Sequence, residues 1–181
     1  MIQKLCHFIF FKLLRWRVVG EIPTIDKYIF VAIPHTSNWD FVYAWMALRA
    51  LGLEVTIFVK DAFFVWPLNY VCKFFGVAPV NRRESTNFVD SIARQYAEND
   101  RLAAIITPEG TRKYNSELKS GYYYLAKKAG VPLVLTGPNY ADKSFSILPP
   151  RAPLATFEED AADIIRFSRT ITARKPDQTF Q

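Results

Sequence analysis

Short apolar runs alternate with amphipathic stretches along the chain, and this alternation predicts a fold of strands and helices. Runs rich in β-branched and aromatic residues are typical of buried strands. They occupy residues 28–33, 53–59, 77–80, 102–107, 131–136 and 144–148. Between two of them, apolar residues recur at intervals of three and four from Val89 to Ala97, which predicts a helix there. The pattern indicates a single-domain α/β fold with a mixed or largely parallel sheet and flanking helices.

Glycine and capping residues indicate where several helices begin and end. Gly52 and Gly130 follow periodic apolar stretches and are expected to end helices, because glycine readily adopts the left-handed conformation found there. Thr156 and Glu159 have the spacing of a capping box and predict a last helix that ends before Pro176. Ligands of α/β sheets bind beyond the carboxyl ends of strands, so a functional site is expected in segments that follow them.

The segment after the first predicted strand carries the strongest candidate for chemistry. Pro34 ends the apolar run 28–33, Ser37 is placed to cap the next helix, and Asp40 then occupies the third helical position. His35 precedes the cap in non-helical backbone and can fold back toward the Asp40 carboxylate. On a continuous helix these side chains would lie about 140° apart, so their pairing depends on a helix that begins between them.

General-base catalysis is the chemistry that His35 and Asp40 predict. A neutral imidazole held by a carboxylate can take a proton from a hydroxyl, and the carboxylate stabilises the resulting imidazolium. The sequence has no Gly-x-Ser-x-Gly element, and Cys6 and Cys72 lie in apolar segments, so a substrate hydroxyl is the expected nucleophile. The alternative is that Ser37 and Asp40 form only a capping box and that His35 is an ordinary loop residue.

Three later blocks follow this pair in an order that resembles the phospholipid/glycerol acyltransferase family, whose best-known members are the lysophosphatidate acyltransferases. The first block of the family, His-x-x-x-x-Asp, is met by His35 and Asp40. The second, Gly-x-x-aromatic-aliphatic-x-Arg, is matched by residues 76–82. The third, Pro-Glu-Gly-Thr-Arg, is identical to residues 108–112, and the fourth, a short apolar run after a helix, corresponds to residues 131–135.

The chain departs from the family pattern at four positions. Pro34 and Thr36 flank the histidine, where the family often has a polar residue before it and Arg or Gln after it. Pro79 replaces the aromatic residue of the second block, and Leu135 stands where the fourth block has a proline. The family uses the altered blocks to shape the acceptor and acyl sites, so these departures bear on which lipid is the acceptor. The paired histidine and aspartate are unchanged.

The resemblance implies transfer of a fatty acyl group from acyl-CoA or acyl carrier protein to a hydroxyl of a lysophospholipid, glycerol phosphate or related lipid. In that reaction His35 would be the general base and Asp40 would orient it and stabilise its charge. No cofactor is implied beyond the acyl donor. Arg82 would hold an anionic head group, because a guanidinium makes paired hydrogen bonds to phosphate oxygens. The alternative for Arg82 is a surface arginine beside Arg83.

The third block would complete the acceptor site. Glu109, Gly110 and Thr111 would bind polar groups of the acceptor, where glycine permits close backbone approach. Arg112 would add a second anion contact. The alternative is that the block forms an ordinary turn.

Two other functions are consistent with the same fold. One is a non-catalytic lipid-binding protein that has lost turnover through the departures at Pro34, Pro79 and Leu135. The other is a thioesterase, in which water replaces the lipid acceptor at the same base.

The first twenty residues are expected to form an interfacial helix ahead of an acyltransferase-like domain at residues 21–181. Aromatic and aliphatic residues here are interrupted by Lys4, Lys12, Arg15 and Arg17, so no uncharged run approaches the roughly 20 residues of a membrane span. Such a mixture suits the surface of an anionic membrane. This predicts a peripheral protein on the cytoplasmic face, and the alternative is a packed N-terminal core helix.

A second apolar stretch, residues 62–72, contains a proline that would break or kink a helix. It is expected to border an acyl channel, to dip into the membrane interface, or to belong to the core.

Composition narrows the classes of partner. The chain has 181 residues, a net charge of +6 and a sequence pI near 9.3, which favours anionic partners. No recognition helix, zinc spacing or RNP-type strand accompanies this charge, so an anionic membrane is expected and nucleic acid is not. Two cysteines in separate apolar segments predict no disulfide and a reducing compartment. The sparse, unpaired histidines and cysteines predict no metal site.

Overall fold

The computed structural model describes residues 1–60, 70, 72, 74–80 and 88–180. Within these residues the main sheet has the strand order β1-β7-β6-β2-β5. Its strands are β1 (Arg17–Gly20), β2 (Lys27–Ala32), β5 (Leu102–Ile106), β6 (Leu133–Asn139) and β7 (Ser144–Ile147). Neighbouring strands are parallel except β6 and β7, which are antiparallel. The predicted α/β fold with a largely parallel, mixed sheet is confirmed.

A second, two-stranded sheet lies beside the first. Its strands β3 (Ile57–Lys60) and β4 (Val77–Val80) are parallel, and a bridge between Thr56 and Ala104 links this sheet to β5. The predicted strand 53–59 therefore begins later than expected, because residues 53–55 run as irregular chain before the bridge.

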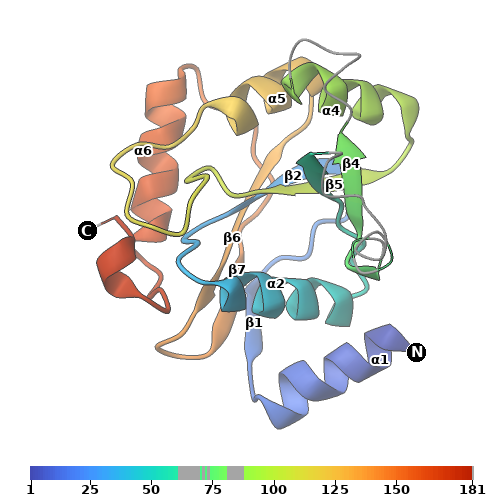
Figure 1. Cartoon of the computed structure of the whole chain (residues 1–181), viewed down its shortest axis with the longest axis vertical. Helices are drawn as coiled ribbons and strands as arrows, with labels where there is room; N and C mark the ends of the chain where they lie inside the picture. The colour runs from blue at the N-terminus through green and yellow to red at the C-terminus, as the bar shows by residue number, and fades with distance from the viewer. Residues whose placement is uncertain (61–69, 71, 73, 81–87, 181) are drawn as a thin grey trace.

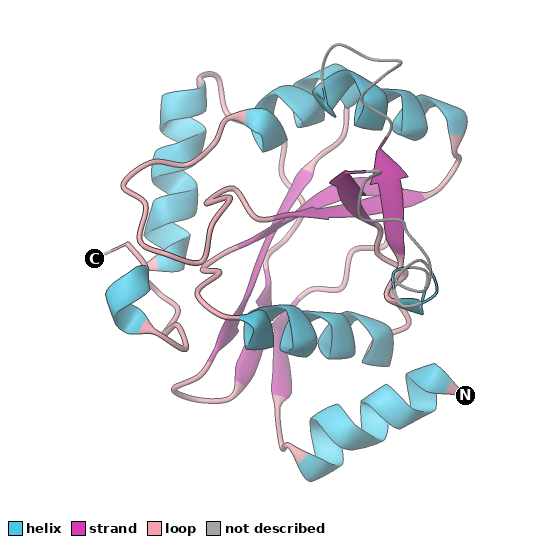
Figure 2. Ribbon diagram, viewed as in Figure 1, coloured by secondary structure: helices cyan, strands magenta, loops and turns pink. Residues whose placement is uncertain are grey.

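Helices cover both faces of the main sheet (Figures 1 and 2). One face packs against α4 (Phe88–Glu98), α5 (Gly121–Ala129) and α6 (Phe157–Ser168), and the other packs against α2 (Asn38–Ala50). Successive side chains of β2 point to opposite faces of the sheet and so contribute to the hydrophobic cores on both sides. Ile29 and Val31 face α4, α5 and α6, whereas Tyr28 and Phe30 face α2. A short 3₁₀ helix, η3 (Pro176–Gln178), lies near the C-terminus.

The predicted helix ends at Gly52 and Gly130 and the predicted helix start at Thr156 are confirmed. Gly130 follows α5 with φ 65°, and Gly52 follows α2 with φ 79°, so both adopt the left-handed conformation. Thr156 caps α6 by accepting from the Glu159 N–H at 3.2 Å, and the Glu159 carboxylate accepts in return from the Thr156 N–H.

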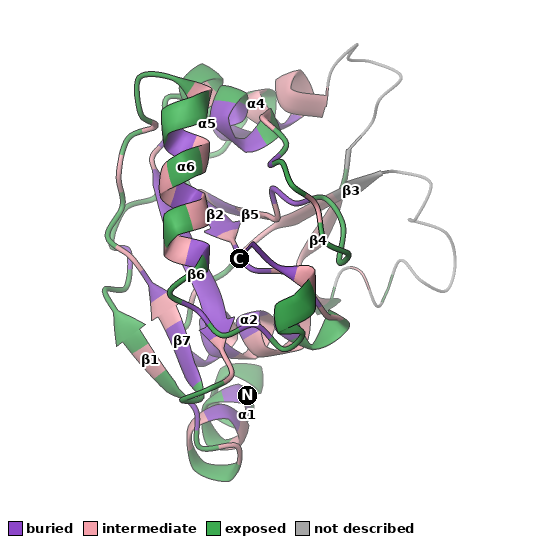
Figure 3. Cartoon of the chain, turned by 90° about the vertical axis from the view of Figure 1, so that its left-hand side faces the viewer, coloured by how far each residue is buried: buried purple, intermediate pink, exposed green. Residues whose placement is uncertain are grey.

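The N-terminal segment divides differently from the prediction of one helix over residues 1–20. α1 (Ile2–His7) continues into a π-helical segment, η1 (Phe8–Leu13), after which Arg15 turns the chain with φ 57°. Residues 17–20 then form β1, an exposed edge strand parallel to β7 (Figure 3). The β-branched residues Val18 and Val19 suit a strand, and the free edge of β7 supplies its hydrogen bonds.

The N-terminal helical segment has one packed side and one exposed apolar side. Cys6 and Phe10 are buried, and Phe10 packs against the α2 side of the core. Large apolar side chains on the other side are exposed, namely Ile2, Leu5, Phe8 and Leu13. Over the described residues, no helix combines the length and apolar composition that crossing a bilayer requires.

Gly137 in β6 allows the backbone at Ile33, two residues before His35, to lie close to β6. The Ile33 N–H donates to the Thr136 carbonyl at 2.9 Å, and a Cβ added at Gly137 would lie 2.2 Å from the Ile33 carbonyl oxygen. No side chain fits between these two backbones.

Substitution Gly137→Ala is expected to lower the free energy of unfolding by about 2 kcal/mol or more, because β6 must move away from Ile33. Urea unfolding measures the effect. Gly121→Ala is the matched control, since a Cβ there meets no atom within 4 Å and alanine favours the helix that begins there. An alanine variant at 137 as stable as the native protein would contradict the close approach.

Candidate functional site

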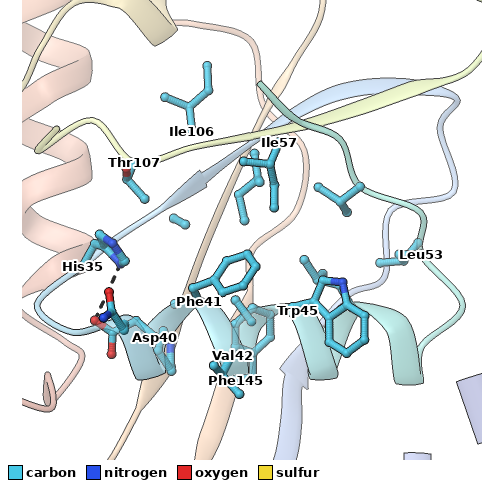
Figure 4. A pocket seen from close by; sticks show the side chains of 18 of the residues that line it. His35, Asp40, Phe41, Val42, Trp45, Leu53, Ile57, Ile106, Thr107 and Phe145 are labelled. Carbon is cyan, nitrogen blue, oxygen red and sulfur yellow. Dashed lines mark ion pairs between the residues drawn. The ribbon is translucent and has the colours of Figure 1, made fainter. Parts of the chain in front are cut away.

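The junction of β2 and α2 brings His35 and Asp40 together as predicted. Ser37 is the N-cap of α2, and its hydroxyl accepts from the Trp39 N–H at 3.2 Å. Asp40, at the third helical position, accepts in return from the Ser37 N–H at 2.7 Å. His35 stands before the cap, and its Nδ1 lies 3.7 Å from Asp40 Oδ2 (Figure 4). This distance is that of an ion pair and is longer than a hydrogen bond.

The protein holds both oxygens of the Asp40 carboxylate. Oδ2 accepts from the N–H groups of Thr36 at 2.6 Å and Ser37 at 2.7 Å, and Oδ1 accepts from the Tyr140 hydroxyl at 2.7 Å. The side chain is only 4% exposed. The capping box and the histidine contact are therefore not alternatives, because the same carboxylate makes both.

Glu109 lies behind His35. It follows β5, the parallel neighbour of β2, and its Oε2 accepts from the His35 backbone N–H at 2.7 Å. The side chain is 3% exposed, and this burial raises the pKa of Glu109 to about 7, against the opposing effect of the His35 N–H. The structure thus gives Glu109 a contact inside the protein, and its predicted contact with the acceptor stays a prediction.

The electrostatic surroundings favour a neutral His35. Burial lowers the pKa of the imidazole, the Asp40 carboxylate raises it, and the Arg112 guanidinium lowers it again. The net direction is downward, so the ring is unprotonated near neutral pH and can accept a proton.

The other predicted site residues are placed as follows. Arg112 is exposed and donates to Asn38 Oδ1 in the first turn of α2, beside the paired His35 and Asp40. Gly110 has φ 65°, and the Lys119 side chain occupies the space that a Cβ would take. Thr111 is exposed, and its hydroxyl accepts from the Lys113 N–H at 3.2 Å. Arg82 lies outside the described residues.

A cavity of about 540 Å³ extends from His35 along the side of α2 that faces β3 and β5 (Figure 4). Figure 4 shows His35 and Asp40 at one end and Trp45 and Leu53 at the other. Its walls between these ends are mainly apolar and include Phe41, Val42, Ile57, Ile106 and Phe145. Pockets for small molecules in proteins are of this size and have a few polar groups on an apolar lining.

The predicted apolar stretch 62–72 falls almost wholly outside the described residues, of which it includes only residues 70 and 72. Its three proposed locations stay predictions. Within the described residues, no group of three His, Cys, Asp or Glu side chains is arranged to hold a metal ion.

Sequence reasoning missed the residues that reach the site from the C-terminal quarter of the chain. Tyr140 follows β6 and binds Asp40, and the Arg174 guanidinium lies 5.3 Å from the Trp39 ring centroid and 5.7 Å from that of Tyr140. The Lys175 N–H donates to the Thr36 hydroxyl at 3.3 Å. They are separated from His35 by more than a hundred residues and belong to no motif, so no local signal identifies them.

The raised pKa of Glu109 predicts a pH-dependent stability that Glu109→Gln removes. Because folding favours protonated Glu109, its ionisation lowers the free energy of unfolding as pH rises from about 4.5 to about 7. The amide oxygen of the introduced glutamine can still accept from the His35 N–H, and the amide does not ionise. The variant should gain up to about 3 kcal/mol relative to the native protein over this range, as measured by urea unfolding at several pH values. A constant difference across the range would contradict this prediction.

Comparison with known proteins identifies the family and the fold of this chain. The family described as Acyltransferase matches residues 15–135, which include all four sequence blocks. The solved structure of the 1-acyl-sn-glycerophosphate (LPA) acyltransferase PlsC from Thermotoga maritima is similar in fold, with a TM-score of 0.63 and 18% sequence identity. The match covers 93% of this chain and 76% of that one. No curated protein matches the sequence. Since the family match covers more than half of the chain, the chain belongs to the Acyltransferase family.

Proposed function

We propose that this protein transfers a fatty acyl group from acyl-CoA or acyl carrier protein to a hydroxyl of a lysophospholipid, glycerol phosphate or related lipid. The observation that carries the proposal is the position of His35 and Asp40 at one end of a long apolar cavity. A base beside a site for an acyl chain is the arrangement that this reaction requires. The PlsC structure, which has the same fold, is that of an LPA acyltransferase.

His35 would act as the general base. Its Nδ1 faces Asp40, so Nε2 takes the proton of the acceptor hydroxyl while the oxygen attacks the thioester carbonyl. The carbon–sulfur bond then breaks, and the imidazolium returns the proton to the departing thiolate. Asp40 stabilises the imidazolium between the two proton transfers. The distance of 3.7 Å is compatible with this role, since catalytic contacts often tighten only when substrate binds.

The apolar cavity would hold the acyl chain. Burial of the chain between α2 and the sheet places the thioester carbonyl near His35 and keeps water from its tail. The far end, at Trp45 and Leu53, would limit the chain length.

Arg112 and Arg82 would bind the anionic part of the acceptor. Arg112 lies beside the first turn of α2, close enough for its charge to lower the pKa of His35. Gly110 and Thr111 would approach the acceptor from the same loop. Glu109 would contribute mainly by holding the His35 backbone, although contact with polar acceptor groups remains part of the proposal.

The exposed apolar side of α1 and η1 would lie in the interface of an anionic membrane on the cytoplasmic face. Leu5 and Phe8 are more than half exposed, and Lys4 and Lys12 are exposed on the same segment. Apolar insertion combined with cation attraction gives reversible binding. This contact would bring a lipid acceptor to a protein whose N-terminal helix packs against the site-bearing helix α2.

Substitution His35→Ala should reduce acyl transfer by about 10² to 10⁴, because the general base is removed. The measurement is transfer from labelled acyl thioesters into a panel of lysolipids, glycerol 3-phosphate and amino-acid lipids. His7→Ala is the matched control, since His7 is the second of the chain's two histidines and is exposed in α1. Both variants should sediment with anionic vesicles as the native protein does.

Each alternative function has its own outcome in this experiment. Free fatty acid without acylated lipid identifies a thioesterase. No product from folded, vesicle-bound native protein with any donor or acceptor identifies a lipid-binding protein. Failure of the native protein to sediment with anionic vesicles would overturn the membrane contact and leave the catalytic proposal standing.

Substitution Leu53→Trp should shift the preference toward shorter acyl chains, because the larger ring fills the far end of the cavity. The ratio of kcat/KM for long over short acyl thioesters is expected to fall about 10-fold or more. Leu154→Trp, at a partly exposed position away from the cavity wall, serves as the control. An unchanged ratio would show that the acyl chain does not reach Leu53.

A further inference from the structure

Tyr140 binds a residue of the site although Tyr140 itself lies outside the residues that match the family. It follows β6, beyond the residues 15–135 that match the family. Its hydroxyl donates to Asp40 Oδ1 at 2.7 Å across 100 residues of sequence. A hydrogen bond to a charged acceptor is about twice as strong as a neutral one, so this contact is a strong constraint on the carboxylate.

The hydroxyl of Tyr140 completes the set of donors that determines how the Asp40 carboxylate is oriented. The N–H groups of Thr36 and Ser37 both bind Oδ2, the oxygen that faces His35. They leave Oδ1 to Tyr140. With donors on both oxygens the carboxylate cannot rotate about its terminal bond without losing a hydrogen bond in a buried position, which is costly.

The position of Tyr140 is itself determined by packing on several sides. Its ring packs edge-on against Trp16 and Tyr43, with centroids 5.4 Å and 5.6 Å away. The Arg174 guanidinium lies over the ring at 5.7 Å, and the Tyr140 N–H donates to the Thr172 carbonyl at 3.0 Å. Residues from three separate parts of the chain therefore hold the Tyr140 ring with its hydroxyl toward Asp40.

Tyr140 remains a donor over the whole physiological pH range. Burial raises the pKa of its phenol, and the hydrogen bond to Asp40 and the charge of that carboxylate raise it further. The Arg174 charge opposes these effects without reversing them.

We infer that Tyr140 is a positioning residue that holds the Asp40 carboxylate in the orientation that faces His35. The inference rests on the proposed function of the His35 and Asp40 pair. A purely structural anchor between β6 and α2 is the competing explanation. The two differ in what removal of the hydroxyl does to His35.

The test is Tyr140→Phe, which removes the hydroxyl and keeps the ring. The expected kcat for acyl transfer is about 10-fold lower, because a misplaced catalytic group costs rate even when the shift is small. KM for the acyl thioester should stay within about twofold, since Tyr140 is not part of the cavity wall. Tyr43→Phe is the matched control, because it removes a hydroxyl from the same aromatic cluster that is not a partner of Asp40.

A second readout does not depend on turnover. The chain has two histidines, so an NMR titration resolves the His35 ring, and His35→Ala assigns it. The charged groups that act on this ring are Asp40 and Arg112, and Glu109 binds the backbone N–H of the same residue. Asp40 raises the pKa of the imidazole, and without the phenol its carboxylate is free to turn away from the ring. Tyr140→Phe should therefore lower the His35 titration midpoint by about half a pH unit. The same change in an Asp40→Asn background should produce no shift.

Each outcome decides the inference. An unchanged kcat and an unchanged His35 midpoint in folded Tyr140→Phe would overturn it, and so would loss of stability alone, which identifies a structural anchor. If the native protein transfers no acyl group, the proposed function fails while the titration still tests the positioning. If Tyr140→Phe does not fold, 3-fluorotyrosine incorporated at position 140 provides a stronger donor and should shift the His35 midpoint. No change with that analogue would also overturn the inference.

Discussion

The site depends on a single buried carboxylate at the beginning of α2. Asp40 accepts from two backbone N–H groups that would otherwise be unpaired at the start of the helix, and it faces the His35 ring with the same oxygen. The interaction that begins the helix therefore also places the charge beside the histidine. Because the carboxylate is almost wholly buried, its geometry is set by hydrogen bonds and not by solvent.

The parallel sheet supplies the rest of the constellation. β2 and β5 run side by side in the same direction, so the loops that follow them meet, and Glu109 reaches the His35 backbone. β6 lies on the other side of β2 and delivers Tyr140 to Asp40 from a third loop. Three strand ends thus converge on one short segment, which is the usual position of a site in sheets of this kind.

The cavity follows from the same arrangement. α2 has Asp40 in its first turn, directly after His35 and the N-cap, and continues as one wall of an apolar space whose other walls include residues of β3 and β5. Polar chemistry and apolar binding are therefore arranged along one helix. The N-terminal helical segment packs on the opposite side of α2 and leaves Leu5 and Phe8 exposed, so the helix lies between the cavity and the surface proposed for membrane contact.

Local sequence determined the elements whose signals are local: the strands with continuous apolar runs, the caps at Ser37 and Thr156, the pairing of His35 with Asp40 across a helix start, and the family blocks. Tertiary structure decided the rest. Residues 17–20 became β1 because an edge of β7 was free to pair, and no signal within those residues shows that edge. Glu109 binds the His35 backbone N–H. Tyr140 and Arg174 lie at the site although they are distant from it in sequence. Such contacts depend on which strand ends become neighbours in the folded sheet, and spacing along a single sequence carries no information about that.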